Sequence, residues 1–122
     1  MRSRHIHITV NLDRVRANAE ALRRRLSARI IAVIKADAYG LGAPEVADTL
    51  ASAVDEFGYF SIHEAREVGR PGIVLGPPDA EPAAFHELRL RPAISTFEDA
   101  ARFADIPVAV KLDTGMQRFG CI

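Results

Sequence analysis

The sequence predicts an α/β fold, and more specifically about the first five strands of a parallel, TIM-type (β/α) barrel. Short apolar runs alternate with segments of helical periodicity along the whole chain, and Ser-x-x-Glu capping signals at 61–64 and 95–98 mark two of the helix starts. With 122 residues the chain can bury one compact core, but it is shorter than a complete barrel of about 250 residues. An open doubly wound sheet is the alternative, but no Gly-x-Gly-x-x-Gly follows the first strand.

The N-terminal residues predict one strand and one helix. Apolar and polar residues alternate over 5–12, the period of a half-buried strand, so residues 1–12 are expected to precede the barrel as a strand. From Leu12 to Leu26 apolar residues recur every three or four positions, which predicts an amphipathic helix with Asn11 or Asp13 as its cap.

The barrel elements follow in regular order. The first barrel strand, 29–34, is apolar nearly throughout and is expected to be buried on both faces. Further strands are expected at 57–61, 72–76, 92–94 and 108–112. Helices are expected after Pro44, from Ser61 to Gly69, from Asp79, and from Ser95 to about Phe103.

Composition excludes several classes of function. Lys plus Arg equals Asp plus Glu, so no overall field attracts nucleic acid. No apolar run approaches the ~20 residues of a membrane helix, and the start lacks a secretory signal, so a cytoplasmic protein is expected. Cys121 has no partner for a disulfide, and His5 and His7 lack a supporting cluster of metal ligands.

Two lysines stand out in a chain that otherwise uses arginine. Fourteen of its sixteen basic residues are Arg, and Lys35 and Lys111 both lie at the ends of predicted strands. In (β/α) folds the carboxyl ends of the strands form the face on which chemistry is done. Lysine can lose its proton and become a nucleophilic amine, whereas arginine stays charged. The two lysines are therefore the candidate functional residues.

Three segments carry a resemblance to a known family. They are Ala-Val-Ile-Lys-Ala-Asp-Ala-Tyr-Gly-Leu-Gly at 32–42, Phe-Gly-Tyr-Phe-Ser-Ile-His-Glu-Ala at 57–65 and Lys-Leu-Asp-Thr-Gly-Met-Gln-Arg-Phe-Gly at 111–120. The sequence resembles the N-terminal barrel domain of the pyridoxal-phosphate-dependent alanine racemases. Leu41 departs from the pattern, since the family often has His between the two glycines.

The resemblance implies a role for each matching residue. Lys35 would hold pyridoxal 5'-phosphate as a Schiff base and then act as a base on one face of the substrate. Tyr39 would bind the cofactor phosphate. Lys111 would be carbamylated and orient Arg118, which would lie near the cofactor's phenolic oxygen and the substrate carboxylate. No metal is implied.

The resemblance also implies a larger enzyme. The parent would be a cytoplasmic homodimer with shared active sites that interconverts L- and D-alanine and supplies D-alanine for peptidoglycan. Its second base, a tyrosine from the partner subunit, and the rest of its barrel and its β-domain lie beyond the matched segments. Residues 1–122 alone are expected to be inactive.

Other interpretations compete with a racemase. A non-catalytic pyridoxal-phosphate homeostasis protein shares the barrel but usually lacks the tyrosine after the lysine and the 111–118 segment. A split enzyme with its other half on a separate chain is a further alternative. Asp113-Thr114-Gly115 matches the triplet of aspartic proteases, but it occurs once and the α/β pattern argues against that fold. Serine remains an alternative to alanine as substrate.

Overall fold

A single parallel sheet organises the chain. The structure, a computed structural model, describes residues 6–122. The strands are β1 (Ile31–Val33), β2 (Glu56–Tyr59), β3 (Gly72–Val74), β4 (Leu90–Ile94) and β5 (Ala109–Val110). They lie side by side in the order β1-β2-β3-β4-β5, and every neighbouring pair is parallel. Sequential order is the arrangement of a (β/α) barrel, whereas doubly wound sheets reverse direction, so the predicted partial barrel is confirmed.

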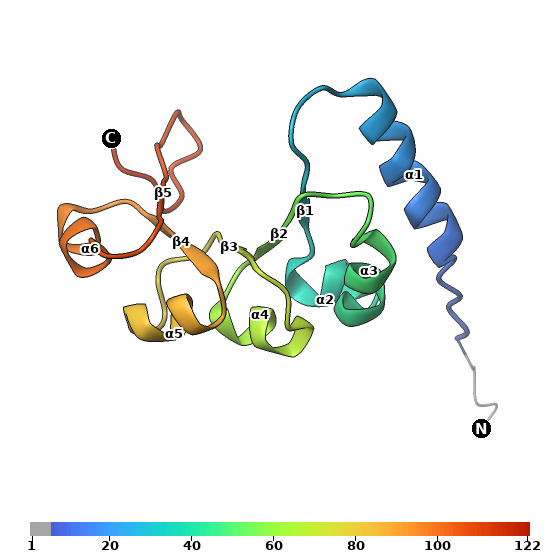
Figure 1. The fold of residues 1–122 in the computed structure, drawn as a ribbon, viewed down its shortest axis with the longest axis horizontal. Helices are drawn as coiled ribbons and strands as arrows, with labels where there is room; N and C mark the ends of the chain where they lie inside the picture. The colour runs from blue at the N-terminus through green and yellow to red at the C-terminus, as the bar shows by residue number, and fades with distance from the viewer. Residues whose placement is uncertain (1–5) are drawn as a thin grey trace.

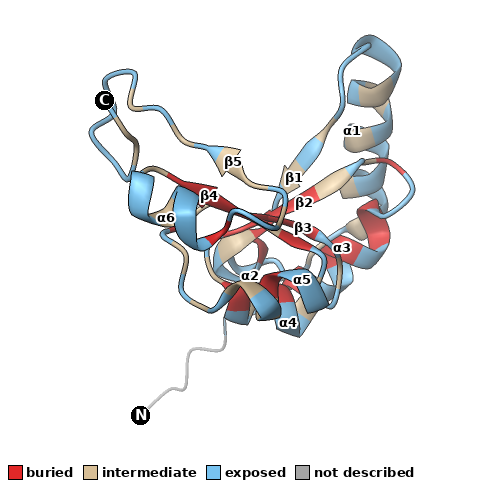
Figure 2. Cartoon of the chain, turned by 60° about the vertical axis from the view of Figure 1, so that its left-hand side comes forward, coloured by how far each residue is buried: buried red, intermediate tan, exposed pale blue. Residues whose placement is uncertain are grey.

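Helices connect the strands and cover one face of the sheet (Figures 1 and 2). These connecting helices are α2 (Lys35–Gly40), α3 (Ala43–Leu50), α4 (Ile62–Val68), α5 (Pro82–Glu87) and α6 (Phe97–Arg102), and α1 (Leu12–Arg25) precedes β1. Helix α1 stands at one end of the molecule, where it packs on α3. Within residues 6–122 no helix is both long enough and apolar enough to cross a membrane.

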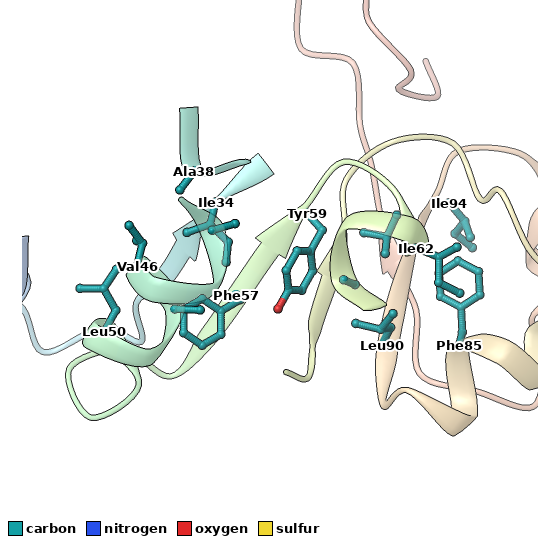
Figure 3. Packing of buried hydrophobic residues seen from close by; sticks show 14 of the residues in the cluster. Ile34, Ala38, Val46, Leu50, Phe57, Tyr59, Ile62, Phe85, Leu90 and Ile94 are labelled. Carbon is teal, nitrogen blue, oxygen red and sulfur yellow. The ribbon is translucent and has the colours of Figure 1, made fainter. Parts of the chain in front are cut away.

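The core lies between the sheet and its helices (Figure 3). Phe57 and Tyr59 of β2 point into it, together with Phe85 of α5, and their side chains are buried. Phe85 meets Phe103 edge to face with ring centroids 5.4 Å apart, a geometry that stabilises aromatic pairs beyond simple burial. Alternate strand residues therefore anchor one face of the sheet, and the residues between them point to the opposite face.

The opposite face of the sheet is open at β1, which corrects the expected burial of this strand. Ile31 and Val33 are 44% and 40% exposed. The strand is apolar on both faces, but among the described residues it is an edge strand that pairs only with β2. Further along the same face Glu56 and Arg91 form an ion pair across the intervening β3. The sequence indicated an apolar strand at 29–34, but it could not indicate whether other elements would pack against both of its faces.

Caps define several helix ends. Ser61 Oγ accepts from the amide of Glu64, and Gly69 ends α4 with φ +70°, both as predicted. Two predicted helix starts were wrong. Thr96, not Ser95, caps α6, because its hydroxyl accepts from an amide of the first turn.

The other misplaced start is that of α5. Asp79 is not its cap, because both carboxylate oxygens of Asp79 face the amide of Ile62 at the start of α4. Helix α5 begins instead at Pro82, a residue that fits the first helical turn because it needs no amide partner there.

The N-terminal segment differs from the prediction. Residues 6–11 form no strand, and Ile6 and Ile8 are exposed, while the predicted residue His5 lies outside the described part. A strand needs a neighbouring strand with which to pair, and residues 6–11 pair with no strand in the described part of the chain, although the outer edge of β1 is free there. Alternation by itself did not reveal that this segment would stay unpaired. The predicted helix from Leu12 is confirmed, and Asn11 caps it by accepting from Arg14.

Candidate functional site

A pocket at the carboxyl ends of the strands collects three of the four predicted site residues. It has a volume of about 250 Å³ and is lined by Lys35, Phe60, Leu75, Lys111, Arg118 and Phe119. Lys35 follows β1, Phe60 follows β2, Leu75 follows β3 and Lys111 follows β5. Parallel strands end at the same edge, which is why residues so far apart in sequence meet here.

Lys35 opens an unusual backbone turn. The four residues after it, 36–39, have φ between +51° and +57° and ψ between +36° and +50°, so α2 is a left-handed turn. For residues with a Cβ this conformation costs roughly 1–2 kcal/mol each. None of the four is glycine. The turn therefore persists only because surrounding contacts hold it.

Hydrogen bonds tie the turn at its far end and its middle. Asp37 Oδ1 accepts from the amide of Ala43 at 2.7 Å, and its carbonyl accepts from Gly42 at 3.1 Å. The amide of Ala38 donates to Ile34 at 2.9 Å. Gly42, at φ +91°, then leads directly into α3. The predicted Gly-x-Gly turn is confirmed, but sequence did not predict the left-handed turn before it.

Tyr39 is the predicted site residue that the pocket leaves out. It lies at the end of the left-handed turn, its side chain is 65% exposed, and it is not among the lining residues. It is one of two tyrosines in the chain. The other, Tyr59, is buried and donates to the carbonyl of Arg70 at 3.0 Å, and burial raises its pKa to about 12. Tyr59 therefore serves the core and is unsuited to act as a base.

Lys111 is held from several directions. Its backbone amide donates to Ile94 and its carbonyl accepts from Cys121, at 2.8 and 2.9 Å. Its Nζ donates to the carbonyl of Leu75 at 3.2 Å and lies 5.5 Å from the centroid of the Phe119 ring. The side chain is half-buried. These contacts keep the amine inside the pocket and prevent the extended, solvated position usual for lysine.

The loop that carries Arg118 is folded around one carboxylate. Asp113 Oδ1 accepts from the amides of Gln117 and Gly115 at 3.0 and 2.8 Å, and these bonds hold the pKa of Asp113 below its ordinary value of 3.8. Gly120 passes so close that a Cβ there would lie 2.5 Å from the Asp113 nitrogen. The loop thereby turns back on itself and brings the exposed Arg118 to the pocket.

The electrostatics of the pocket favour an anion. Its three ionisable lining residues are Lys35, Lys111 and Arg118, and no carboxylate lines it. Cations confined at a partly desolvated site attract phosphate or carboxylate strongly. Among residues 6–122 no group of three or more His, Cys, Asp and Glu side chains could hold a metal ion. The arrangement suits an anionic ligand that can also react with an amine.

Sequence reasoning missed the apolar side of the pocket. Phe60, Leu75 and Phe119 were not singled out, although Phe60 and Leu75 follow strands just as the lysines do. Applying the strand-end rule to every strand would have found these two. Phe60 and Phe119 lie 6.4 Å apart between ring centroids and form one wall.

Comparison with known proteins decides the family. The family model described as "Alanine racemase, N-terminal domain" matches residues 10–122. The chain belongs to the alanine racemase family. Among curated relatives, the alanine racemase of Aquifex aeolicus is 36% identical over 123 residues and that of Acidiphilium cryptum 33% over 132, with 93% and 95% of this chain covered.

Solved structures agree with this assignment. The biosynthetic alanine racemase from Pseudomonas aeruginosa superposes with a TM-score of 0.72 at 33% identity, over 88% of this chain and 34% of that one. The alanine racemase from E. faecalis reaches a TM-score of 0.83 at 25% identity, over 92% and 35%. The chain spans about a third of the length of its relatives, 36% for both curated racemases named above.

Proposed function

We propose that this chain supplies the cofactor-binding part of an alanine racemase active site, in an enzyme that interconverts L- and D-alanine with pyridoxal 5'-phosphate. The observation that carries the proposal is the convergence of Lys35, Lys111 and Arg118 on one pocket at the carboxyl ends of the strands. Family membership supports the reaction, since the relatives named above are alanine racemases.

The pocket fits the cofactor by its chemistry. Pyridoxal phosphate carries an aldehyde, a phenolic oxygen and a phosphate, and the pocket offers a primary amine, a guanidinium and a second amine with no competing carboxylate. Its volume of about 250 Å³ lies just below the ~300–1,000 Å³ typical of small-molecule sites. Lys35 would hold the aldehyde carbon, and Tyr39, which lies outside the pocket lining, would hydrogen-bond the phosphate as the family resemblance implies.

Each residue of the pocket would have a separate role in racemisation. The bound cofactor supplies an electron sink for the carbanion that forms when the α-proton leaves. Lys35, once its amine is free and neutral, would take that proton from one face or return it. Arg118, a planar fork of donors, would orient the substrate carboxylate and the cofactor's phenolic oxygen. Lys111, in its carbamylated form, would be the anion that fixes the guanidinium.

A second base must act on the opposite face of the substrate, and we assign it to a partner subunit of a homodimer. Of the two lysines that line the pocket, Lys35 would act as a base and Lys111 would be carbamylated, while Tyr59 is buried in the core. Residues 1–122 alone are therefore expected to bind cofactor without racemising alanine. The enzyme would act in the cytoplasm, where its product D-alanine enters peptidoglycan synthesis.

Solvent exchange tests the function. A protein that contains these residues together with the rest of the barrel and its C-terminal domain should, with pyridoxal phosphate in D2O, put deuterium at the α-carbon of alanine and form D-alanine. Lys35→Ala should reduce this rate by at least about a thousandfold, because it removes both attachment and one base. If the Lys35→Ala protein still racemised alanine at the wild-type rate, the proposal would be refuted. The same assay with serine in place of alanine tests which amino acid is the substrate.

A further inference from the structure

Glu64 places its carboxylate between the ends of two strands. Oε1 accepts from the amide of Ala36 at 3.0 Å, and Oε2 accepts from the amide of Phe60 at 2.7 Å. Ala36 directly follows Lys35, and Phe60 lines the same pocket as Lys35. A single half-buried carboxylate thus bridges the carboxyl ends of β1 and β2, at the point where the pocket begins.

These bonds are not those of a simple helix cap. In a capping box the glutamate reaches back to the amide of the capping residue, which here is Ser61. Glu64 instead reaches past Ser61 to the amides of Phe60 and Ala36, the second of which belongs to a different βα unit. Among the described residues Glu64 forms no ion pair. Its carboxylate accepts hydrogen bonds from two backbone amides, and hydrogen bonds to a charged acceptor are stronger than those between neutral groups.

The bond to Ala36 has a mechanical consequence for Lys35. The left-handed turn starts at Ala36, and no other acceptor for this amide is found in the described residues. Asp37 fastens the far end of the turn to Ala43. Without Glu64 the near end is free to relax to right-handed or extended backbone, which Ala36 prefers. Rotation at Ala36 changes the direction in which the chain leaves Lys35.

We propose that Glu64 is a positioning residue for Lys35: it clamps the first peptide of the left-handed turn and so holds the lysine amine in the pocket. The inference rests on the proposed role of Lys35 as cofactor lysine. Glu64 touches neither cofactor nor substrate in this account. It acts through the backbone of the turn.

The test compares matched truncations on one helix. Glu64→Ala removes both acceptors, whereas Glu67→Ala shortens an exposed side chain of α4 that lies 3.3 Å from the exposed His63 ring. Thr96→Ala removes the cap of the distant α6 and serves as a control for lost stability. Each variant is examined for amide hydrogen exchange and for covalent capture of pyridoxal phosphate, trapped with borohydride and quantified by intact mass.

Glu64→Ala should accelerate exchange of the Ala36 and Phe60 amides and raise the half-saturating concentration of pyridoxal phosphate, each about ten-fold. Glu67→Ala and Thr96→Ala should leave both quantities at wild-type values. Glu64→Gln, which keeps one acceptor oxygen, should give an intermediate result and replaces Glu64→Ala if that variant does not fold.

Two outcomes overturn the inference: unchanged exchange at Ala36 in the Glu64 variants, or faster exchange with unchanged capture of the cofactor. A third outcome would contradict the proposed function and not the role of Glu64. If the wild-type protein captures no pyridoxal phosphate at Lys35, the cofactor role fails, while the exchange data still report whether Glu64 holds the turn.

Discussion

Ala36 and Ala38 adopt φ of +52° and +51°, a conformation that alanine ordinarily avoids. Both belong to the turn that follows Lys35. Strain of this kind is concentrated at functional sites, where the surrounding structure enforces it. The backbone beside Lys35 is therefore specified by its tethers and not by local preference. Alanine, a strong former of right-handed helix, gave no sign of it in the sequence.

Replacement of Ala36 by glycine tests this strain. Glycine adopts positive φ without penalty, and the relief of about 1–2 kcal/mol should outweigh its larger entropy loss of about 0.5–1 kcal/mol. We expect Ala36→Gly to leave the free energy of unfolding unchanged or to raise it slightly. The same change at Ala17, exposed in the right-handed α1, should lower it by about 1 kcal/mol. Urea denaturation measures both, and equal losses would contradict the account.

The stability of the loop around Asp113 should depend on pH. Because its pKa in the folded loop lies below 3.8, its contribution to stability is complete above pH 3.8 and is lost as the pH falls through the lowered value. The amide resonances of Gln117 and Gly115, which donate to it, should titrate with a midpoint below 3.8. Asp113→Asn should abolish this titration. A midpoint at or above 3.8 in the wild type would be inconsistent with the folded loop.

At the scale of elements, close packing of β2 and β3 requires glycine at position 72. A Cβ there would lie 2.3 Å from the carbonyl oxygen of Phe57, a backbone atom of the paired strand, and 2.8 Å from the Tyr59 ring. Neither strand can retreat without breaking the ladder. Gly72→Ala should therefore lower the free energy of unfolding by about 3 kcal/mol or more.

Thermal or chemical denaturation checks this prediction. Ser52→Ala, at an exposed turn, should change the free energy of unfolding by less than about 0.5 kcal/mol and serves as the control. A Gly72→Ala protein as stable as the Ser52→Ala protein would show that the two strands are farther apart than described.

Elements were predictable where local chemistry determines them. Apolar periodicity and caps such as Ser61 and Gly69 located the strands and helices to within a few residues. The failures have a common physical cause. Asp79 was a credible helix cap but bonds to a different helix, and residues 6–11 alternate as a strand does but pair with no strand among the described residues. In both cases a tertiary partner, or its absence, decided the outcome.

At the scale of the whole molecule, the sheet is open on both sides. Ile31 and Val33 are exposed at β1, and at the other edge strand Val110 of β5 and Leu112 just after it are 64% and 66% exposed. Exposed apolar edges favour association. Residues 1–122 prepared alone should self-associate in sedimentation velocity experiments as their concentration rises. The double change Val110→Lys and Leu112→Lys should reduce the association, and a wild-type chain that stays monomeric throughout would contradict this expectation.

Some residues of the pocket could be predicted from the sequence, and others could not. Lys35 and Lys111 were predictable because strand ends in this fold meet at one edge, and a chain rich in arginine keeps lysine at two of them. Arg118 was reached only through family resemblance, because its approach depends on the loop folded around Asp113. Tyr39 was predicted to share the site, but it lies outside the pocket lining. Tyr39 is the last residue of the left-handed turn after Lys35, and no sequence pattern predicted that turn.

The residue to which pyridoxal phosphate attaches shows directly whether Lys35 holds the cofactor. The chain has two lysines, so pyridoxal phosphate trapped with borohydride can be located by peptide mass mapping on Lys35, Lys111 or the N-terminal amine. We expect the adduct on Lys35 in the wild type and its loss in Lys35→Ala. Attachment at Lys111, or equal labelling of wild type and Lys35→Ala, would contradict the assignment of Lys35 as the residue that holds the cofactor.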